Sequence, residues 1–223
     1  MIDRLLEFVA PHHCFGCGKI GTVLCVNCKY NIVDEAFSGC IVCTRPSFAG
    51  ICNRCKTTYD KAWCVGDREG VLERLINAYK FDRVRRASAT LGALLDETLP
   101  VLPAHTVVVP VPTVRSHIRV RGYDHAYLVA REFAKRRKLR LKPHVSRSAS
   151  TSQRGLNKPE RMKEAKLAFY CSDKLDATTP YLVVDDVVTT NTTLRYAAGV
   201  LHDAGATTIW AAVIARQPLD KQG

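Results

Sequence analysis

Four short cysteine pairs near the N-terminus constrain the fold of this chain more than any other feature. Each pair has the spacing C-x-x-C, and all eight cysteines fall between residues 14 and 55. They are Cys14 and Cys17, Cys25 and Cys28, Cys40 and Cys43, and Cys52 and Cys55. Two such knuckles supply the four thiolates of a closed tetrahedral zinc site. The pattern predicts a small module held together by two structural Zn2+ ions.

The spacing alone leaves the pairing of the knuckles open. Sequential pairing joins the first knuckle to the second and the third to the fourth, whereas interleaved pairing joins the first to the third and the second to the fourth. We favour sequential pairing. An iron–sulfur cluster or a disulfide module is the alternative to zinc, although a reducing cytoplasm disfavours disulfides.

Beyond the cysteine module, strand patterns alternate with helix patterns. Apolar side chains recur at helical spacing between residues 72 and 95, and we expect further helices at 124–138 and 193–204. We expect strands at 106–109, 167–171, 181–185 and 207–215. This alternation predicts a parallel sheet flanked by helices. The predicted organisation is a zinc module over residues 1–64, followed by an α/β domain over residues 65–223.

Charge is distributed unevenly along the chain. The 223 residues include 33 Lys and Arg against 21 Asp and Glu, a net charge of +12. The segment 115–166 holds 16 basic and 4 acidic residues, so it carries the whole excess. Such a segment favours a polyanionic partner, either nucleic acid or a phosphorylated small molecule. No apolar run is long enough for membrane insertion, and the N-terminus does not resemble a signal peptide, so we expect a cytoplasmic protein.

The most informative stretch is 181–194, with the sequence YLVVDDVVTTNTTL. An apolar strand runs into two acids, then into a loop of hydroxyl side chains, then into a helix. Ligands of open α/β sheets bind at the carboxyl ends of strands, and a helix N-terminus there can hold a phosphate. The two acids would repel a phosphate at close range but would suit hydroxyl groups. A sugar phosphate satisfies both requirements.

This stretch resembles the phosphoribosyl pyrophosphate (PRPP) signature of type I phosphoribosyltransferases. It departs from that signature at Asn191, where the family usually has glycine, although asparagine tolerates the same left-handed backbone. The resemblance extends to the ComF (competence protein F) family through most of the chain. The residues that carry it are the segments 79–81, 109–112, 121–126, 152–156 and 213–216, with Arg115, Arg119 and Arg161.

The resemblance implies a type I phosphoribosyltransferase-like parallel sheet flanked by helices, with a small N-terminal double zinc ribbon. Asp185 and Asp186 would be the catalytic pair that holds the ribose hydroxyls. The 5′-phosphate would bind the loop formed by Thr189, Thr190, Asn191, Thr192 and Thr193. The pyrophosphate would lie near Arg115, Arg119 and Arg121, with Mg2+ bound together with PRPP. A flexible loop containing Gln153 and Arg161 would close over the ligand.

Two functions fit this combination. A ComF-type protein would support DNA uptake in natural transformation, binding single-stranded DNA through the basic segment, contacting proteins of the uptake machinery and using its PRPP site to sense a 5′-phosphate ligand. A metabolic phosphoribosyltransferase would instead transfer ribose 5-phosphate from PRPP to a small nitrogen nucleophile. We favour the first, and the sequence does not decide whether the protein is an enzyme.

Overall fold

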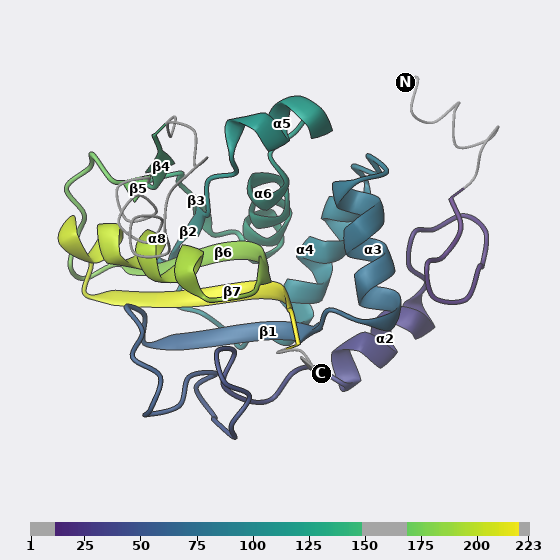
Figure 1. The fold of residues 1–223 in the computed structure, drawn as a ribbon, viewed down its shortest axis with the longest axis horizontal. Coiled ribbons are helices and arrows are strands. Elements are labelled where there is room, and N and C mark those ends of the chain that lie inside the picture. Colours follow the sequence, from purple (N-terminus) through teal and green to yellow (C-terminus); the bar gives the residue numbers. More distant parts are fainter. Residues whose placement is uncertain (1–11, 149–168, 219–223) are drawn as a thin grey trace, which may run out of the picture.

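A five-stranded parallel sheet forms the centre of the molecule. The computed structural model describes residues 12–148 and 169–218. The sheet has the order β1-β7-β6-β2-β3, and all of its strand pairs are parallel (Figure 1). Its strands are β1 (Lys61–Asp67), β2 (Val107–Pro110), β3 (Arg140–Leu141), β6 (Pro180–Val188) and β7 (Thr208–Arg216). A separate antiparallel pair joins β4 (Ser146–Arg147) to β5 (Phe169–Tyr170).

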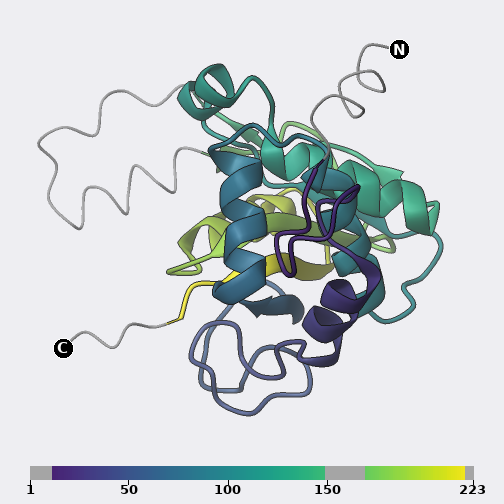
Figure 2. The ribbon, with the colours of Figure 1, turned by 90° about the vertical axis from the view of Figure 1, so that its right-hand side faces the viewer.

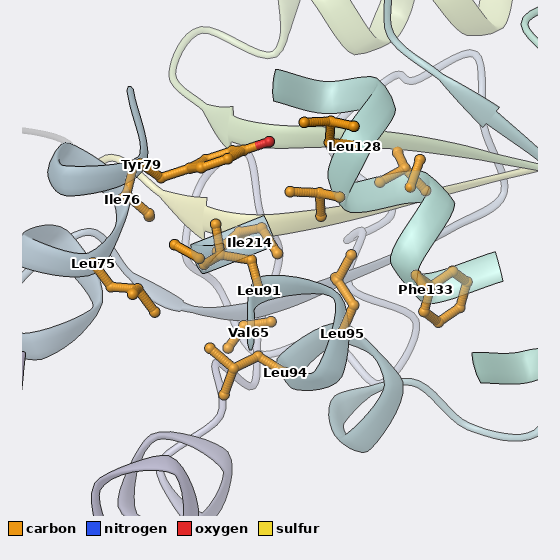
Figure 3. Close-up of a cluster of buried hydrophobic side chains, with 14 of the residues drawn as sticks. Val65, Leu75, Ile76, Tyr79, Leu91, Leu94, Leu95, Leu128, Phe133 and Ile214 are labelled. Atoms are coloured by element: carbon orange, nitrogen blue, oxygen red, sulfur yellow. The ribbon is translucent and has the colours of Figure 1, made fainter. Parts of the chain in front are cut away.

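Helices cover both faces of this sheet. The described helices are α2 (Val26–Asp34), α3 (Gly70–Lys80), α4 (Ala87–Thr98), α5 (Arg115–Arg121), α6 (His125–Arg137) and α8 (Thr192–Asp203). Helices α3, α4 and α6 share one buried apolar cluster with the sheet, and α8 shares a second cluster with the opposite face. Figure 3 shows the first cluster, in which Leu91, Leu94 and Leu95 of α4 lie between side chains of α3 and α6. The predicted parallel sheet flanked by helices is confirmed.

The two cysteine segments lie on different sides of the molecule (Figures 1 and 2). Val23 and Leu24 of the first segment pack into the apolar cluster of α3, α4 and α6. Ile41 and Tyr59, from the second segment and the stretch that follows it, pack into the cluster of α8. The N-terminal module therefore contributes to both layers of the core.

The sequence analysis missed β1, the edge strand that follows the cysteines. Its sequence KAWCVGD mixes apolar, charged and glycine residues, so neither strict alternation nor a continuous apolar run marks it as a strand. It nevertheless pairs with β7 from Lys61 to Asp67. Since β1 straddles residue 64, the division of the chain at that residue remains a prediction. Within the described residues, no helix is long and apolar enough to cross a bilayer.

Strand order identifies where a ligand would bind. From β2 the chain passes through α6 to β3 on one side, whereas from β6 it passes through α8 to β7 on the other. Beta2 and β6 are neighbours, so the direction of winding reverses between them. In open parallel sheets, the crevice outside the carboxyl ends of two such strands is the usual ligand site. Here the segments 111–115 and 189–193 border that crevice.

Candidate functional site

The cysteines form two separate four-thiol clusters. Within each cluster all four sulfur atoms lie within 4.8 Å of one another. One cluster contains Cys14, Cys17, Cys25 and Cys28, and the other contains Cys40, Cys43, Cys52 and Cys55. This is sequential pairing, and interleaved pairing is excluded.

Both clusters fit a tetrahedral zinc ion. Zn–S bonds of about 2.3 Å place neighbouring sulfurs about 3.8 Å apart. The Sγ atoms of Cys17 and Cys25 are 3.6 Å apart, and those of Cys43 and Cys52 are 3.4 Å apart. Gly16 turns the first knuckle, where a Cβ atom would lie 2.4 Å from the Cys28 sulfur. The donor set and its spacing are therefore compatible with two structural Zn2+ ions.

Backbone amides favour the thiolate form of Cys14. Burial alone would raise the pKa of this thiol, but hydrogen bonds from the amides of Cys17, Cys25 and Gly16 lower the pKa to about 6. Metal ligation requires the thiolate, so the fold prepares this side chain for a cation.

The hydroxyl-rich loop lies at the crevice between β2 and β6. Thr189 and Thr190 are exposed, and the hydroxyl oxygens of Thr190 and Thr192 are 3.0 Å apart. Asn191 has φ +60° and ψ 1°, which confirms the expected left-handed backbone. Its side chain makes no capping bond to α8, the helix that begins at the next residue. The first amides of α8 therefore face the crevice without this common side-chain cap.

The two consecutive acids lie on opposite faces of the sheet. Both belong to β6, which extends three residues beyond the predicted strand end at residue 185, and successive side chains of a strand alternate in direction. Asp186 is buried at 4% exposure and faces the layer of α3 and α6. Its Oδ2 lies 2.9 Å from Nζ of Lys80 and 2.8 Å from Nε2 of His125. The Asp186 carboxylate is thus held by two side chains from neighbouring helices.

This ion pairing extends to the predicted pyrophosphate residue Arg121. Its guanidinium nitrogen Nη1 lies 2.8 Å from Nδ1 of His125. Arginine can only donate, so Nδ1 accepts and the ring proton is on Nε2, facing Asp186. Burial would raise the pKa of Asp186, but His125 and Lys80 outweigh it and hold that pKa below its usual range.

Asp185 has different surroundings. It is half-buried and faces the other layer of the molecule, where Arg147 is its basic neighbour. Burial and the charge of Asp186 raise the pKa of Asp185 to about 8. Its Oδ1 accepts a hydrogen bond of 2.8 Å from the amide of Asp186. Of the two acids, Asp185 is the one not already bound by a lysine or histidine.

A basic cavity of about 260 Å3 lies at the carboxyl end of α3 and beside α5. It is lined by Lys80, Phe81, Arg83, His117, Val120 and Arg121. Burial lowers the pKa of His117, and so do the charges of Arg121, His125, Lys80 and Arg147. This crowding of cations gives the cavity a positive potential suited to an anion.

The three predicted pyrophosphate arginines lie on a short helix, α5, rather than on a loop. Arg115 and Arg119 are exposed and share one face because they are four residues apart. Arg121 turns instead into the basic cavity. The predicted flexible-loop residues Gln153 and Arg161 lie outside the described residues.

Sequence reasoning gave no site role to Lys80 or Arg147. Lys80 is distant in the chain from the acid pair and reaches it only because α3 packs beside β6. The resemblance did contain a signal, since Lys80 lies in the matching segment 79–81. Arg147 lies on β4, a two-residue strand with no periodicity to mark it.

Comparisons with known proteins add little to this picture. No protein-family model and no curated protein matches the chain. Among solved structures, one match is described as the structure of the allosteric regulatory enzyme of purine biosynthesis, with a TM-score of 0.42, 18% sequence identity and coverage of 56% of this chain. The chain spans only 25% of that protein's length. At this level of similarity, the strand order and packing of the chain itself define its fold.

Proposed function

We propose that the crevice between β2 and β6 binds PRPP or a related ribose 5-phosphate. The observation that carries this proposal is the coincidence of three features at the point where the sheet reverses its winding. These are the uncapped start of α8, the hydroxyl-rich loop before it and the half-buried Asp185. A helix N-terminus favours a phosphate, and a carboxylate one strand-end away favours ribose hydroxyls.

Each part of PRPP then has a matching group in the chain. The loop 189–193 binds the 5′-phosphate, Asp185 accepts from the ribose hydroxyls, and the basic cavity attracts the pyrophosphate. Asp186 acts indirectly, by fixing Lys80 and His125. Asp185 and the oxygens of PRPP would hold Mg2+, which offsets the negative charge of the pyrophosphate leaving group.

Calorimetry with Mg2+ and PRPP on the zinc-loaded protein tests this proposal. We expect saturable binding that Asp185→Asn weakens at least tenfold. The control is Asp203→Asn, which removes an exposed acid at the far end of α8 and should leave the affinity unchanged. Absence of binding by the folded wild-type protein, or equal effects of both substitutions, would exclude the proposed site.

Turnover distinguishes a phosphoribosyltransferase from a PRPP-binding protein. If the protein is the metabolic enzyme, pyrophosphate is released from PRPP when the right nitrogen nucleophile is present. Binding without release across amines, purines and pyrimidines would favour the sensing role instead. A phosphoribosyl transfer requires water exclusion as well as charge stabilisation.

We also propose the ComF-type role, in which the basic segment binds single-stranded DNA for uptake in natural transformation. The observation that favours it is the exposure of Arg115 and Arg119 on α5, next to the basic cavity. Binding should weaken steeply as salt rises, because each neutralised phosphate releases counterions. Arg115→Ala with Arg119→Ala should reduce both the affinity and the salt slope. Lys61→Ala with Lys174→Ala removes two exposed cations outside this segment and serves as the control.

A further inference from the structure

The conformation of Asn191 needs a partner. A residue other than glycine is disfavoured in the left-handed region, and asparagine usually settles there through local hydrogen bonds of its side chain. Asn191 has φ +60° and is only 4% exposed, yet its side chain does not cap α8. Something outside the loop must satisfy the buried amide group.

That partner comes from the second cysteine module. The hydroxyl of Tyr59 donates a hydrogen bond of 2.6 Å to Oδ1 of Asn191. Tyr59 is itself 4% exposed and lies in the apolar cluster that contains Leu194 of α8. The contact joins residues 132 positions apart in the chain.

A second bond holds the same two segments together. The hydroxyl of Thr58 donates to the carbonyl of Arg195 at 2.7 Å. Thr57 donates to the carbonyl of Tyr59, also at 2.7 Å, which stiffens the stretch between Cys55 and β1. The module itself is tied to β1, because the amide of Ala62 bonds to the carbonyl of Ala49 at 2.8 Å.

We propose that Tyr59 is a positioning residue for the phosphate loop. Its hydroxyl fixes Asn191 in the left-handed conformation and keeps that side chain from folding back over the first amides of α8. The second cysteine module thereby sets the geometry of the anion site from the opposite end of the chain. This inference rests on the proposed function of the loop, but the loop geometry can be measured without any ligand.

A double-mutant cycle tests the link. Tyr59→Phe removes only the hydroxyl and should weaken PRPP binding about five- to tenfold, the effect of losing one buried hydrogen bond. In an Asn191→Gly background, Tyr59→Phe should have no further effect, because glycine adopts a positive φ unaided. Tyr30→Phe, at an exposed tyrosine of the first module, is the matched control. Zinc content should stay unchanged in every variant.

Amide exchange of residues 190–194 in the ligand-free protein gives a readout independent of PRPP. Tyr59→Phe should accelerate exchange there, and the same change in the Asn191→Gly background should not. If wild-type protein fails to bind PRPP while this exchange pattern holds, the proposed function fails and the positioning role stands. Exchange and affinity unaffected by Tyr59→Phe, or a loss of equal size in both backgrounds, would overturn the inference.

Discussion

Asp185 and Asp186 are chemically identical neighbours, but the strand gives them different tasks. Sequence reasoning treated them as one pair, because it could not tell which face of the sheet each would occupy. In the structure Asp186 is bound by Lys80 and His125, while Asp185 lies at the crevice. We therefore expect the two acids to differ in what they contribute to stability and to binding.

Paired substitutions should separate the two acids. Asp186→Asn removes the charge that compensates Lys80 inside the protein, so it should lower the free energy of unfolding by about 3 kcal/mol. Asp185→Asn should weaken PRPP binding while leaving that free energy within about 0.5 kcal/mol of wild type. Urea unfolding and calorimetry measure these quantities. Similar unfolding curves for the two variants would contradict the assignment.

The raised pKa of Asp185 predicts a pH dependence of binding. Below a pKa of about 8 the carboxyl is mostly protonated, and above it the carboxylate is available as an acceptor for ribose hydroxyls. PRPP affinity should therefore rise as the pH increases through about 8. Calorimetry between pH 6 and 9 checks this, and Asp185→Asn should flatten the rise. An equal rise in that variant would assign the titration to another group.

At the scale of elements, the strong periodicities predicted the structure well and the weak ones did not. The apolar runs of β2, β6 and β7 and the capped helix α6 could be read from the sequence, and Asp124 does cap α6 through the amide of Tyr127. Beta1 could not, because its side-chain pattern is irregular. The acid pair was found by its motif, but its partner Lys80 depends on tertiary packing that no local pattern reveals.

One basic element shows why charge runs need a structure. Arg137 belongs to the run 135–138, yet it bonds the side chain of Asp96 at 2.6 Å and the carbonyls of Leu99 and Pro100 at the end of α4. Arg137→Ala should therefore lower the free energy of unfolding by about 2 kcal/mol. Its exposed neighbour Arg136 is the control, since Arg136→Ala should change stability by less than about 0.5 kcal/mol. Chemical denaturation that ranks the two variants equally would contradict this role.

The two cysteine clusters should stabilise different elements. Cys52→Ser removes a ligand of the second cluster and should accelerate amide exchange around Tyr59 and the start of α8. Cys25→Ser, the matched change in the first cluster, should instead loosen α2, whose Lys29 pairs with Glu97 of α4 at 2.5 Å. Each variant should lose about half of the bound zinc. Exchange that increases over the same residues in both variants would contradict this division.

At the scale of the whole molecule, the N-terminal module acts as part of the core rather than as an appended unit. Its two halves pack on opposite layers, and β1 continues from it into the sheet. The carboxyl edge of that sheet then brings together a phosphate loop, an available carboxylate and a basic cavity. This arrangement defines one anion site at the point where the winding of the sheet reverses.

Hydrogen–deuterium exchange of the zinc-loaded protein, with and without Mg2+ and PRPP, tests this central claim most directly. The account predicts that a saturating ligand slows exchange in the segments 111–115 and 185–195, which border the crevice. The N-terminal ends of the same strands should be unaffected. PRPP that binds by calorimetry but protects residues elsewhere, and none of these, would show that the site lies outside the crevice.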